Sequence, residues 1–150
     1  MTAQKDQTGG IDYSRYFDRE THLWVKTMSR EVVRCGFDPL GAETSGDIVA
    51  VSFEPPGTRI ERGAAFGSIE AAKFVGPLLA PVSGSIIRHN HEVAAEPGLI
   101  NADPQAHWMI EIEPDALDVE LGELLHGEEA VREWFAAERK KFEHEGLLAT

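Results

Sequence analysis

The chain has 150 residues, of which 26 are acidic and 14 are basic, so its net charge is −12. This length suits one domain with short extensions, which can bury about 70% of the surface of the unfolded chain. Because so acidic a protein repels phosphate groups, we expect neither nucleic acid nor a membrane as its partner. The single cysteine, Cys35, excludes an intramolecular disulfide, and residues 1–10 lack the apolar core of a secretory signal, so the sequence predicts a cytoplasmic protein.

Residues 1–21 are expected to form an N-terminal extension. Residues 1–10 are small and polar, which predicts a disordered segment because they offer little apolar surface to offset their ordering entropy. Residues 13–17 contain three aromatic rings, which are costly to leave in water. We therefore expect this aromatic segment to pack on the main domain.

The main domain, predicted over residues 22–114, consists of short runs rich in β-branched and aromatic residues, separated by Gly, Pro and Asn. The runs are HLWVK, EVVRC, DIVAVSF, AFGSIEAA, VGPLLA, GSIIRH and WMIEIE. Many short strands with frequent turns predict a mainly β fold, a flattened barrel or sandwich of two small antiparallel sheets. The stretches GDIV and GSII each begin a strand ahead of a Pro-Gly pair, which predicts two similar β-units related by a pseudo-twofold.

Two helices are predicted. Pro39 suits a first helical turn, and the two glycines that follow it limit that helix to two turns or fewer. A second helix is expected in the C-terminal extension, residues 115–150, where Gly127 precedes an acidic first turn and Gly146 follows two lysines. Its apolar residues lie close to one face, which we expect to cover the core: Val131, Trp134, Phe135 and Phe142.

Lys73 stands in the apolar run from Phe66 to Pro81, whose only other charged residue is Glu70. A lysine in a buried strand would cost several kcal/mol of desolvation unless it were paired, so we expect it at an exposed tip. Small residues before it and Gly76-Pro77 after it allow the chain to reverse there. Without further information, Lys73 could equally be an ordinary solvated turn lysine.

A series of motifs at suitable spacing decides between these two interpretations. They are THLWV, GDIVAVSFEPPGTRIERGAAFGSIEAAK, LLAPVSGSIIRHNHEV, PGLINADP and WMIEIEP. Through them the chain from His22 to Pro114 resembles the glycine cleavage H proteins. The resemblance implies a hammerhead fold of the lipoyl and biotinyl type and a non-enzymatic carrier, by default a monomer.

In that family the lysine at the position of Lys73 carries lipoic acid through an amide bond, attached by a lipoate-protein ligase or a lipoyl transferase. Glu70, Phe74 and Gly76 then become candidates for recognition by these enzymes. Biotin carriers have a related hammerhead fold, but their lysine typically lies between two methionines. Because Ala72 and Phe74 flank Lys73, the motif favours lipoate over biotin.

The chain also departs from the family pattern. Typical members resemble Glu-Ser-Val-Lys-Ala around the lysine, with small and polar residues after it, whereas Phe74 and Pro77 add bulk and stiffness here. Leu23 stands where the family usually has glutamate in a His-Glu-Trp motif, and the C-terminal extension with WFAAERKKF is longer. These features resemble the divergent lipoate-binding proteins of sulfur-oxidising bacteria and archaea.

Three functions follow from these resemblances. The sequence favours a lipoyl arm that carries a sulfur intermediate for a heterodisulfide-reductase-like complex, because a dithiol is a good nucleophile toward sulfur donors. In the alternative, the arm shuttles the aminomethyl group of glycine between glycine decarboxylase, aminomethyltransferase and dihydrolipoamide dehydrogenase. The third hypothesis, from another class, is an unmodified interaction module that keeps the fold without the cofactor.

Other reactive side chains are expected to be structural. His89 and His91 could face one side of a strand, but a closed metal site needs further ligands, so we expect exposed histidines and no metal. Cys35 follows two valines in an apolar strand, which predicts a buried thiol. Four carboxylates that could be mistaken for an acid–base pair are expected to point to solvent from alternating strands: Glu61, Asp103, Glu111 and Glu113. We assign no catalytic residues.

Overall fold

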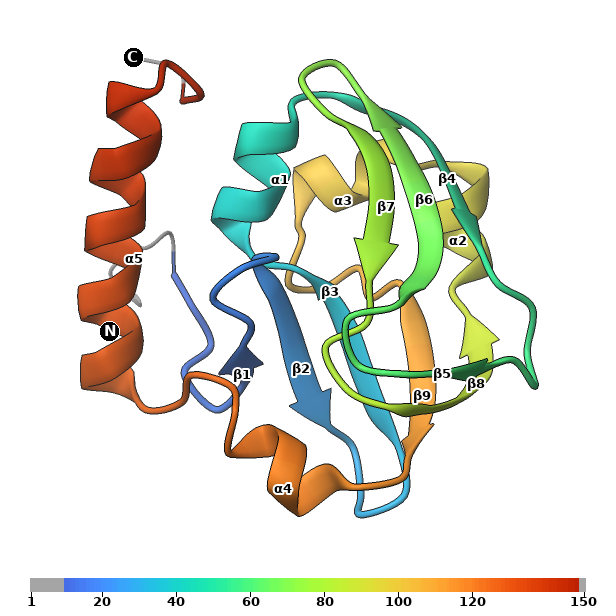
Figure 1. The fold of residues 1–150 in the computed structure, drawn as a ribbon. Coiled ribbons are helices and arrows are strands. Elements are labelled where there is room, and N and C mark those ends of the chain that lie inside the picture. The colour runs from blue at the N-terminus through green and yellow to red at the C-terminus, as the bar shows by residue number, and fades with distance from the viewer. Residues whose placement is uncertain (1–9, 149–150) are drawn as a thin grey trace, which may run out of the picture.

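The computed structural model describes residues 10–148 and contains two antiparallel sheets, several short helices and a long C-terminal helix (Figure 1). The predicted mainly β fold is therefore confirmed. The predicted disordered segment falls largely on residues 1–9, which lie outside the described residues. The division of the chain at residues 21 and 114 remains a prediction.

The larger sheet has six strands in the order β1-β2-β3-β9-β8-β5. The strands are β1 (Tyr16–Phe17), β2 (Leu23–Thr27), β3 (Val33–Phe37), β9 (Ile110–Pro114), β8 (Gly84–His89) and β5 (Arg59–Ile60). Four of them match predicted runs closely. The sequence missed β1 and β5 because two residues are too few to form a recognisable alternation.

The smaller sheet has three strands in the order β4-β6-β7. They are β4 (Ile48–Phe53), β6 (Ala65–Ala71) and β7 (Val75–Leu79). In one register row, Ala50 pairs with Glu70 and Glu70 pairs with Val75, and all three side chains are exposed. The next row, Val51, Ile69 and Gly76, lies on the inner face. The alternation expected for a half-buried sheet is thus present.

Apolar side chains from both sheets form one continuous core that includes Leu23, Phe66, Ile86 and Ile112. Cys35 belongs to this core and is fully buried, and burial raises the pKa of its thiol to about 12. A thiol with so high a pKa is not ionised at neutral pH. The predicted buried thiol is confirmed.

The predicted short helix is α1 (Pro39–Ser45). Asp38 caps its N-terminus, because its carboxylate accepts a hydrogen bond from the N–H of Gly41 at 2.8 Å. The helix ends at Gly46, which has a φ of +76°. A proline in the first turn and a glycine after the last turn therefore fix both ends, as expected.

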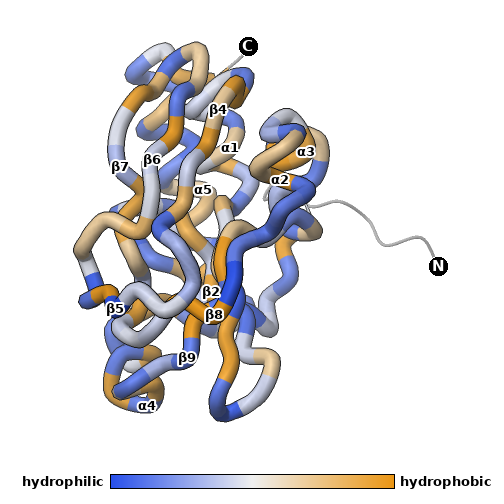
Figure 2. Tube along the Cα trace, turned by 90° about the vertical axis from the view of Figure 1, so that its right-hand side faces the viewer, coloured by the Kyte–Doolittle hydropathy of each residue, from blue (hydrophilic) through white to orange (hydrophobic). Residues whose placement is uncertain are grey.

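Three further short helices were not anticipated: α2 (His91–Ala95), α3 (Gly98–Ala102) and α4 (Leu117–Leu121). Asn90 caps α2, so His91 starts a helix and does not share a strand face with His89. That part of the prediction was wrong because the capping role of asparagine was overlooked. Figure 2 shows the hydrophilic stretch that runs from the end of β8 into α2. The two Pro-Gly pairs on which the prediction of two similar β-units rested also differ in structure. Pro97-Gly98 opens α3, whereas Pro56-Gly57 lies in a turn.

The C-terminal helix α5 (Glu128–His144) follows Gly127 and is followed by Gly146, as predicted. Figure 1 shows it alongside α1 and β1. Val131 and Phe135 are buried in a second apolar cluster with Phe17 and Trp24. This cluster confirms that the aromatic N-terminal segment and the apolar face of α5 both pack on the domain.

Glu111 corrects one prediction. It was expected to point to solvent, but only 5% of its surface is exposed. Arg34 and Arg88 clamp its carboxylate at 2.7 Å from the two neighbouring strands, and their charges and hydrogen bonds hold its pKa below the usual range. Alternation indicates the face on which a residue lies, but other side chains can still cover that face.

Between residues 10 and 148, no helix combines the length and apolar character that crossing a membrane requires.

Candidate functional site: a lysine hairpin beside an apolar pocket

Lys73 lies in the turn between β6 and β7, and its side chain is exposed. The turn is closed by a hydrogen bond from the N–H of Ala71 to the carbonyl oxygen of Phe74 at 2.8 Å. The structure therefore places Lys73 at the tip of a hairpin, where the desolvation argument expected it. An amine in this position is open to a modifying enzyme.

A second segment, the end of α1 and the loop after it, holds the hairpin through backbone hydrogen bonds. The N–H of Lys73 donates to the carbonyl oxygen of Ser45 at 2.8 Å, and that of Ala72 donates to the carbonyl oxygen of Asp47 at 2.9 Å. Gly46 lies between these acceptors. A Cβ added there would stand 3.1 Å from Cε of Lys73 and 3.2 Å from Cβ of Ala72. Glycine thus provides both the left-handed φ and the space in which the lysine stem lies.

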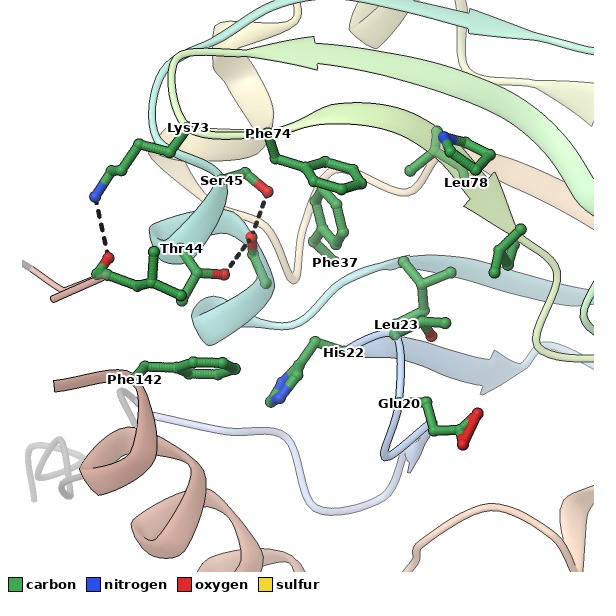
Figure 3. A pocket seen from close by; sticks show the side chains of 15 residues that line it. Glu20, His22, Leu23, Phe37, Thr44, Ser45, Lys73, Phe74, Leu78 and Phe142 are labelled. Atoms are coloured by element: carbon green, nitrogen blue, oxygen red, sulfur yellow. Dashed lines mark hydrogen bonds between the residues drawn. The ribbon is translucent and has the colours of Figure 1, made fainter. Parts of the chain in front are cut away.

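A pocket of about 490 Å³ opens beside the hairpin (Figure 3). Its volume falls in the usual range for small-molecule sites, about 300–1,000 Å³. It is lined by Glu20, Thr21, His22, Leu23, Phe37, Gly41, Thr44, Ser45, Lys73, Phe74, Pro77, Leu78, Leu79, Phe142 and Leu147. The lining comes from the turn before β2, from β2, β3, α1, the lysine hairpin, β7 and α5, and from the segment after α5, so the fold creates a pocket from segments far apart in the sequence.

Most of the lining is apolar. Leu23 and Phe37 lie on strands of the six-stranded sheet, and Leu78 lies on the three-stranded sheet. Phe74 folds over Gly76, where an added Cβ would stand 2.9 Å from Cζ of the ring. Figure 3 shows the rings of Phe74 and Phe37 close together below the hairpin. An apolar guest, such as a hydrocarbon chain, would lose unfavourable contact with water here.

His22 forms the opposite wall of the pocket. Its ring lies between two carboxylates, with Nδ1 2.8 Å from Oδ2 of Asp38 and Nε2 2.8 Å from Oε1 of Glu138. The ring also stacks on Trp134 with a centroid distance of 4.6 Å. His22 has a φ of +60°, which non-glycine residues rarely adopt. Such a conformation persists only where surrounding contacts hold it, as they do here.

The electrostatics of His22 follow from this environment. Burial would lower the pKa of the imidazole, but the hydrogen bonds and negative charges of Asp38 and Glu138 outweigh burial and raise it above the ordinary value of 6.5. Asp38 is fully buried, and burial raises the pKa of its carboxyl despite the hydrogen bond to His22. Because the pKa values of His22 and Asp38 are both raised, the two side chains together hold a proton more tightly than they would as separate groups in water.

The end of α5 and the segment that follows it close the side of the pocket nearest the lysine. Nζ of Lys73 donates to the carbonyl oxygen of Leu147 at 3.0 Å (Figure 3). Phe142 and Leu147 belong to the lining, and the Phe142 ring lies 5.4 Å from the His22 ring. The sequence had predicted Phe142 only as core cover, because the spacing of a helix identifies its apolar face but not a pocket at its edge.

The three recognition candidates lie in different places. Phe74 lies beside Lys73 and lines the pocket, and Gly76 provides the space for its ring. Glu70 is exposed on β6, on the face that points away from the core. A modifying enzyme could therefore contact Glu70 and Lys73 together without entering the pocket.

The described residues hold no group of three or more potential metal ligands. His89 and His91 contact each other edge to face, with ring centroids 4.7 Å apart. The structure offers an exposed amine beside an apolar pocket, an arrangement suited to a covalently attached arm.

Comparison with known proteins supports this interpretation. The profile of the family described as Glycine cleavage H-protein matches residues 15–137. Glycine cleavage system H protein 2 of Aquifex aeolicus (strain VF5) is 32% identical over 118 residues, covering 78% of this chain and 73% of that protein. Glycine cleavage system H protein of Bacillus cereus (strain AH187) is 42% identical over 103 residues, covering 67% of this chain and 80% of that protein.

A solved structure is also similar. The crystal structure of a glycine cleavage system H protein from Mycobacterium marinum superposes with a TM-score of 0.72 at 29% identity. It covers 87% of this chain and 99% of that chain. All of these names refer to glycine cleavage, and none of them refers to sulfur oxidation.

Proposed function

The chain belongs to the glycine cleavage H-protein family, and from this membership we propose that Lys73 carries a lipoyl group that shuttles the aminomethyl group of glycine. Proteins of this family are non-enzymatic carriers with covalently attached lipoic acid. The observation that carries the proposal is the position of Lys73, exposed at a hairpin tip and at the rim of an apolar pocket.

The residues around Lys73 fit a lipoyl group. Gly46 leaves room for the lysine stem, and the closed turn fixes the direction in which the side chain leaves the hairpin. The amide bond to lipoate removes the positive charge of Lys73, which lowers the cost of moving the arm over apolar surface. When bound, the lipoyl group supplies a disulfide that can be reduced and a thiol that can accept a transferred group.

The pocket residues then have a protective role. Leu23, Phe37 and Phe74 offer an apolar surface on which the hydrocarbon part of the arm can lie. An arm held there keeps its end away from bulk water between visits to partner enzymes. The hydrogen bond from Lys73 to Leu147 keeps the unmodified side chain at the mouth of the same pocket.

Membership in the family supports lipoylation enzymes and the glycine cleavage enzymes as partners. These partners are a lipoate-protein ligase or lipoyl transferase, glycine decarboxylase, aminomethyltransferase and dihydrolipoamide dehydrogenase. The names of the relatives support this assignment over the sulfur function that the sequence favoured. Glu70, Phe74 and Gly76 remain our candidates for recognition by the lipoylation enzyme.

A sulfur carrier is the second candidate, and one structural observation favours it. Leu23 stands where the family usually has glutamate, and its side chain is buried and lines the pocket. This replacement makes the pocket less polar, which suits an uncharged sulfur group on the arm. In that case a heterodisulfide-reductase-like complex would take the place of the glycine cleavage enzymes.

The experiment that tests the proposal is intact-mass measurement of the lipoylated protein. Oxidised protein is incubated with glycine and glycine decarboxylase, and reduced protein is incubated with thiosulfate. We expect an aminomethyl adduct in the first sample. A sulfur adduct without any aminomethyl product would contradict the proposal and support the sulfur carrier. Absence of lipoate on Lys73 in protein from its own host would support the unmodified interaction module.

A further inference from the structure

We propose that residues 146–148, the segment after α5, form a latch that holds the amine of unmodified Lys73 and releases it when lipoate is attached. This inference rests on the function proposed above, because lipoylation is the event that releases the latch. Nζ of Lys73 donates to the carbonyl oxygen of Leu147 at 3.0 Å (Figure 3). Within residues 10–148, this is the only hydrogen bond or ion pair of the Lys73 ammonium. The C-terminal segment therefore holds the amine before modification.

The way in which α5 ends determines where the acceptor of Lys73 lies. Gly146 has a φ of +73°, and its N–H donates to the carbonyl oxygen of Glu143 at 3.1 Å. The N–H of Leu147 donates to the carbonyl oxygen of Phe142 at 2.9 Å. These two bonds form a Schellman motif, in which a glycine ends the helix and turns the chain back toward it. Both Phe142 and Leu147 consequently line the pocket.

The latch is short, and the helix before it is fixed independently. Leu148, the last residue of the latch, is buried in the second apolar cluster. The helix α5 is held by Glu138, which lies 2.8 Å from Nε2 of His22, and by Arg139, which lies 3.5 Å from the carboxylate of Glu43. Release of the lysine can therefore loosen the latch without moving α5.

Lipoylation removes the group that the latch binds. The ammonium of Lys73 has three N–H donors and a positive charge, whereas the nitrogen of the lipoyl amide has one N–H and no charge. Hydrogen bonds from charged donors are the stronger ones. The attached chain also starts at Nζ, the atom that contacts Leu147, and the pocket that it enters is lined by Phe142 and Leu147. The arm and the latch therefore compete for the same end of the pocket.

The latch gives the carrier two states. In the unmodified chain, an enzyme must free the amine from Leu147 before it can attach lipoate, so the latch slows modification. In the lipoylated chain, residues 146–148 lose this partner and move more freely. Because the contact between Lys73 and Leu147 is exposed, we expect a modest difference between the two states.

Hydrogen exchange of the C-terminal peptide, measured by mass spectrometry, tests the inference without any partner enzyme. Lys73→Met keeps most of the lysine stem but removes the ammonium. We expect the peptide that contains Leu147 and Leu148 to exchange about two- to tenfold faster in Lys73→Met than in the wild type, and the same increase in the lipoylated wild type. Lys140→Met is the matched control, because Lys140 is exposed on α5 and its amine has no hydrogen-bond or ion-pair partner among residues 10–148.

A second measurement follows the rate at which a lipoate-protein ligase modifies Lys73. Gly146→Ala should weaken the latch without removing a side chain, because alanine is strained at a φ of +73°. We expect lipoylation to be about two- to fivefold faster in this variant. Gly63→Ala is the matched control, because Gly63 has a φ of +88° and, like Gly146, no atom within 4 Å of an added Cβ. Gly63 lies in the turn before β6, outside the pocket lining, so its replacement should leave the rate unchanged.

Two results would overturn the inference. One is exchange of the C-terminal peptide at the same rate in Lys73→Met and in the wild type. The other is a lipoylation rate in Gly146→Ala that equals or falls below that of the wild type. Failure of the ligase to modify wild-type Lys73 would instead contradict the proposed function. Exchange in Lys73→Met needs no lipoate, so it would still decide whether the lysine holds the latch.

Discussion

The two walls of the pocket are held in different ways. On one side, Lys73 stands exposed on a hairpin tip that rests on the loop after α1 through two backbone hydrogen bonds. On the other side, His22 is buried and joined to Asp38 and Glu138 through both ring nitrogens. A carrier needs this asymmetry, because the arm must leave the surface while the surface to which it returns stays fixed.

The two walls also differ in what they contribute to stability. The lysine wall is the hairpin that carries Lys73 at its tip. It depends on local turn geometry, and removing the exposed side chain of Lys73 breaks few contacts. The histidine wall connects the start of β2, the N-terminus of α1 and the middle of α5. Substitutions on the lysine wall should therefore change function, whereas those on the histidine wall should change folding.

The largest functional effect is expected from Lys73→Arg. Arginine keeps the positive charge and the exposed position, but it lacks the amine that forms the lipoyl amide. We expect complete loss of lipoylation by intact mass and complete loss of carrier activity. The unfolding free energy should change by no more than about 0.5 kcal/mol, as for other exposed substitutions. Carrier activity that survives in this variant would contradict the role of the arm.

The largest effect on stability is expected from Asp38→Ala. This change removes the cap on the N–H of Gly41 and leaves His22 without its buried partner. Breaking a buried pair in this way should lower the unfolding free energy by about 3–5 kcal/mol, measured by urea denaturation. Glu138→Ala is the matched comparison, because its side chain is partly exposed and should cost less. Equal losses of unfolding free energy in the two variants would contradict the expectation that the fully buried partner of His22 contributes more to stability than the partly exposed one.

A pH dependence should separate the two walls further. Because the folded state raises the pKa of His22, it holds the imidazole proton more tightly than the unfolded state. This stabilisation is fully present below the ordinary value of 6.5 and is lost as pH rises through the raised pKa. The unfolding free energy of the wild type relative to His22→Gln should therefore fall over that window. The same profile for Lys73→Arg relative to the wild type should be flat there.

Sequence reasoning was most successful for the strands and for Lys73. Short runs rich in β-branched and aromatic residues, separated by Gly, Pro and Asn, identified seven strands. Lys73 had to lie at a tip because an unpaired charge in an apolar strand is costly. It failed for Glu111, whose burial depends on arginines from β3 and β8. The pocket was also missed, because its lining residues meet only in the folded chain and share no sequence pattern.

The smallest effect on carrier function is expected from Gly46→Ala, which tests how closely the hairpin is held. Alanine would be strained at a φ of +76° and would crowd the lysine stem, so the unfolding free energy should fall by about 1–2 kcal/mol. Gly57→Ala is the control, because Gly57 has a φ of +92° with no atom within 4 Å of an added Cβ. Both variants should lose stability through backbone strain, but only Gly46→Ala should slow lipoylation of Lys73 in a ligase assay. Equal lipoylation rates in the two variants would mean that the space at Gly46 serves the backbone and not the arm.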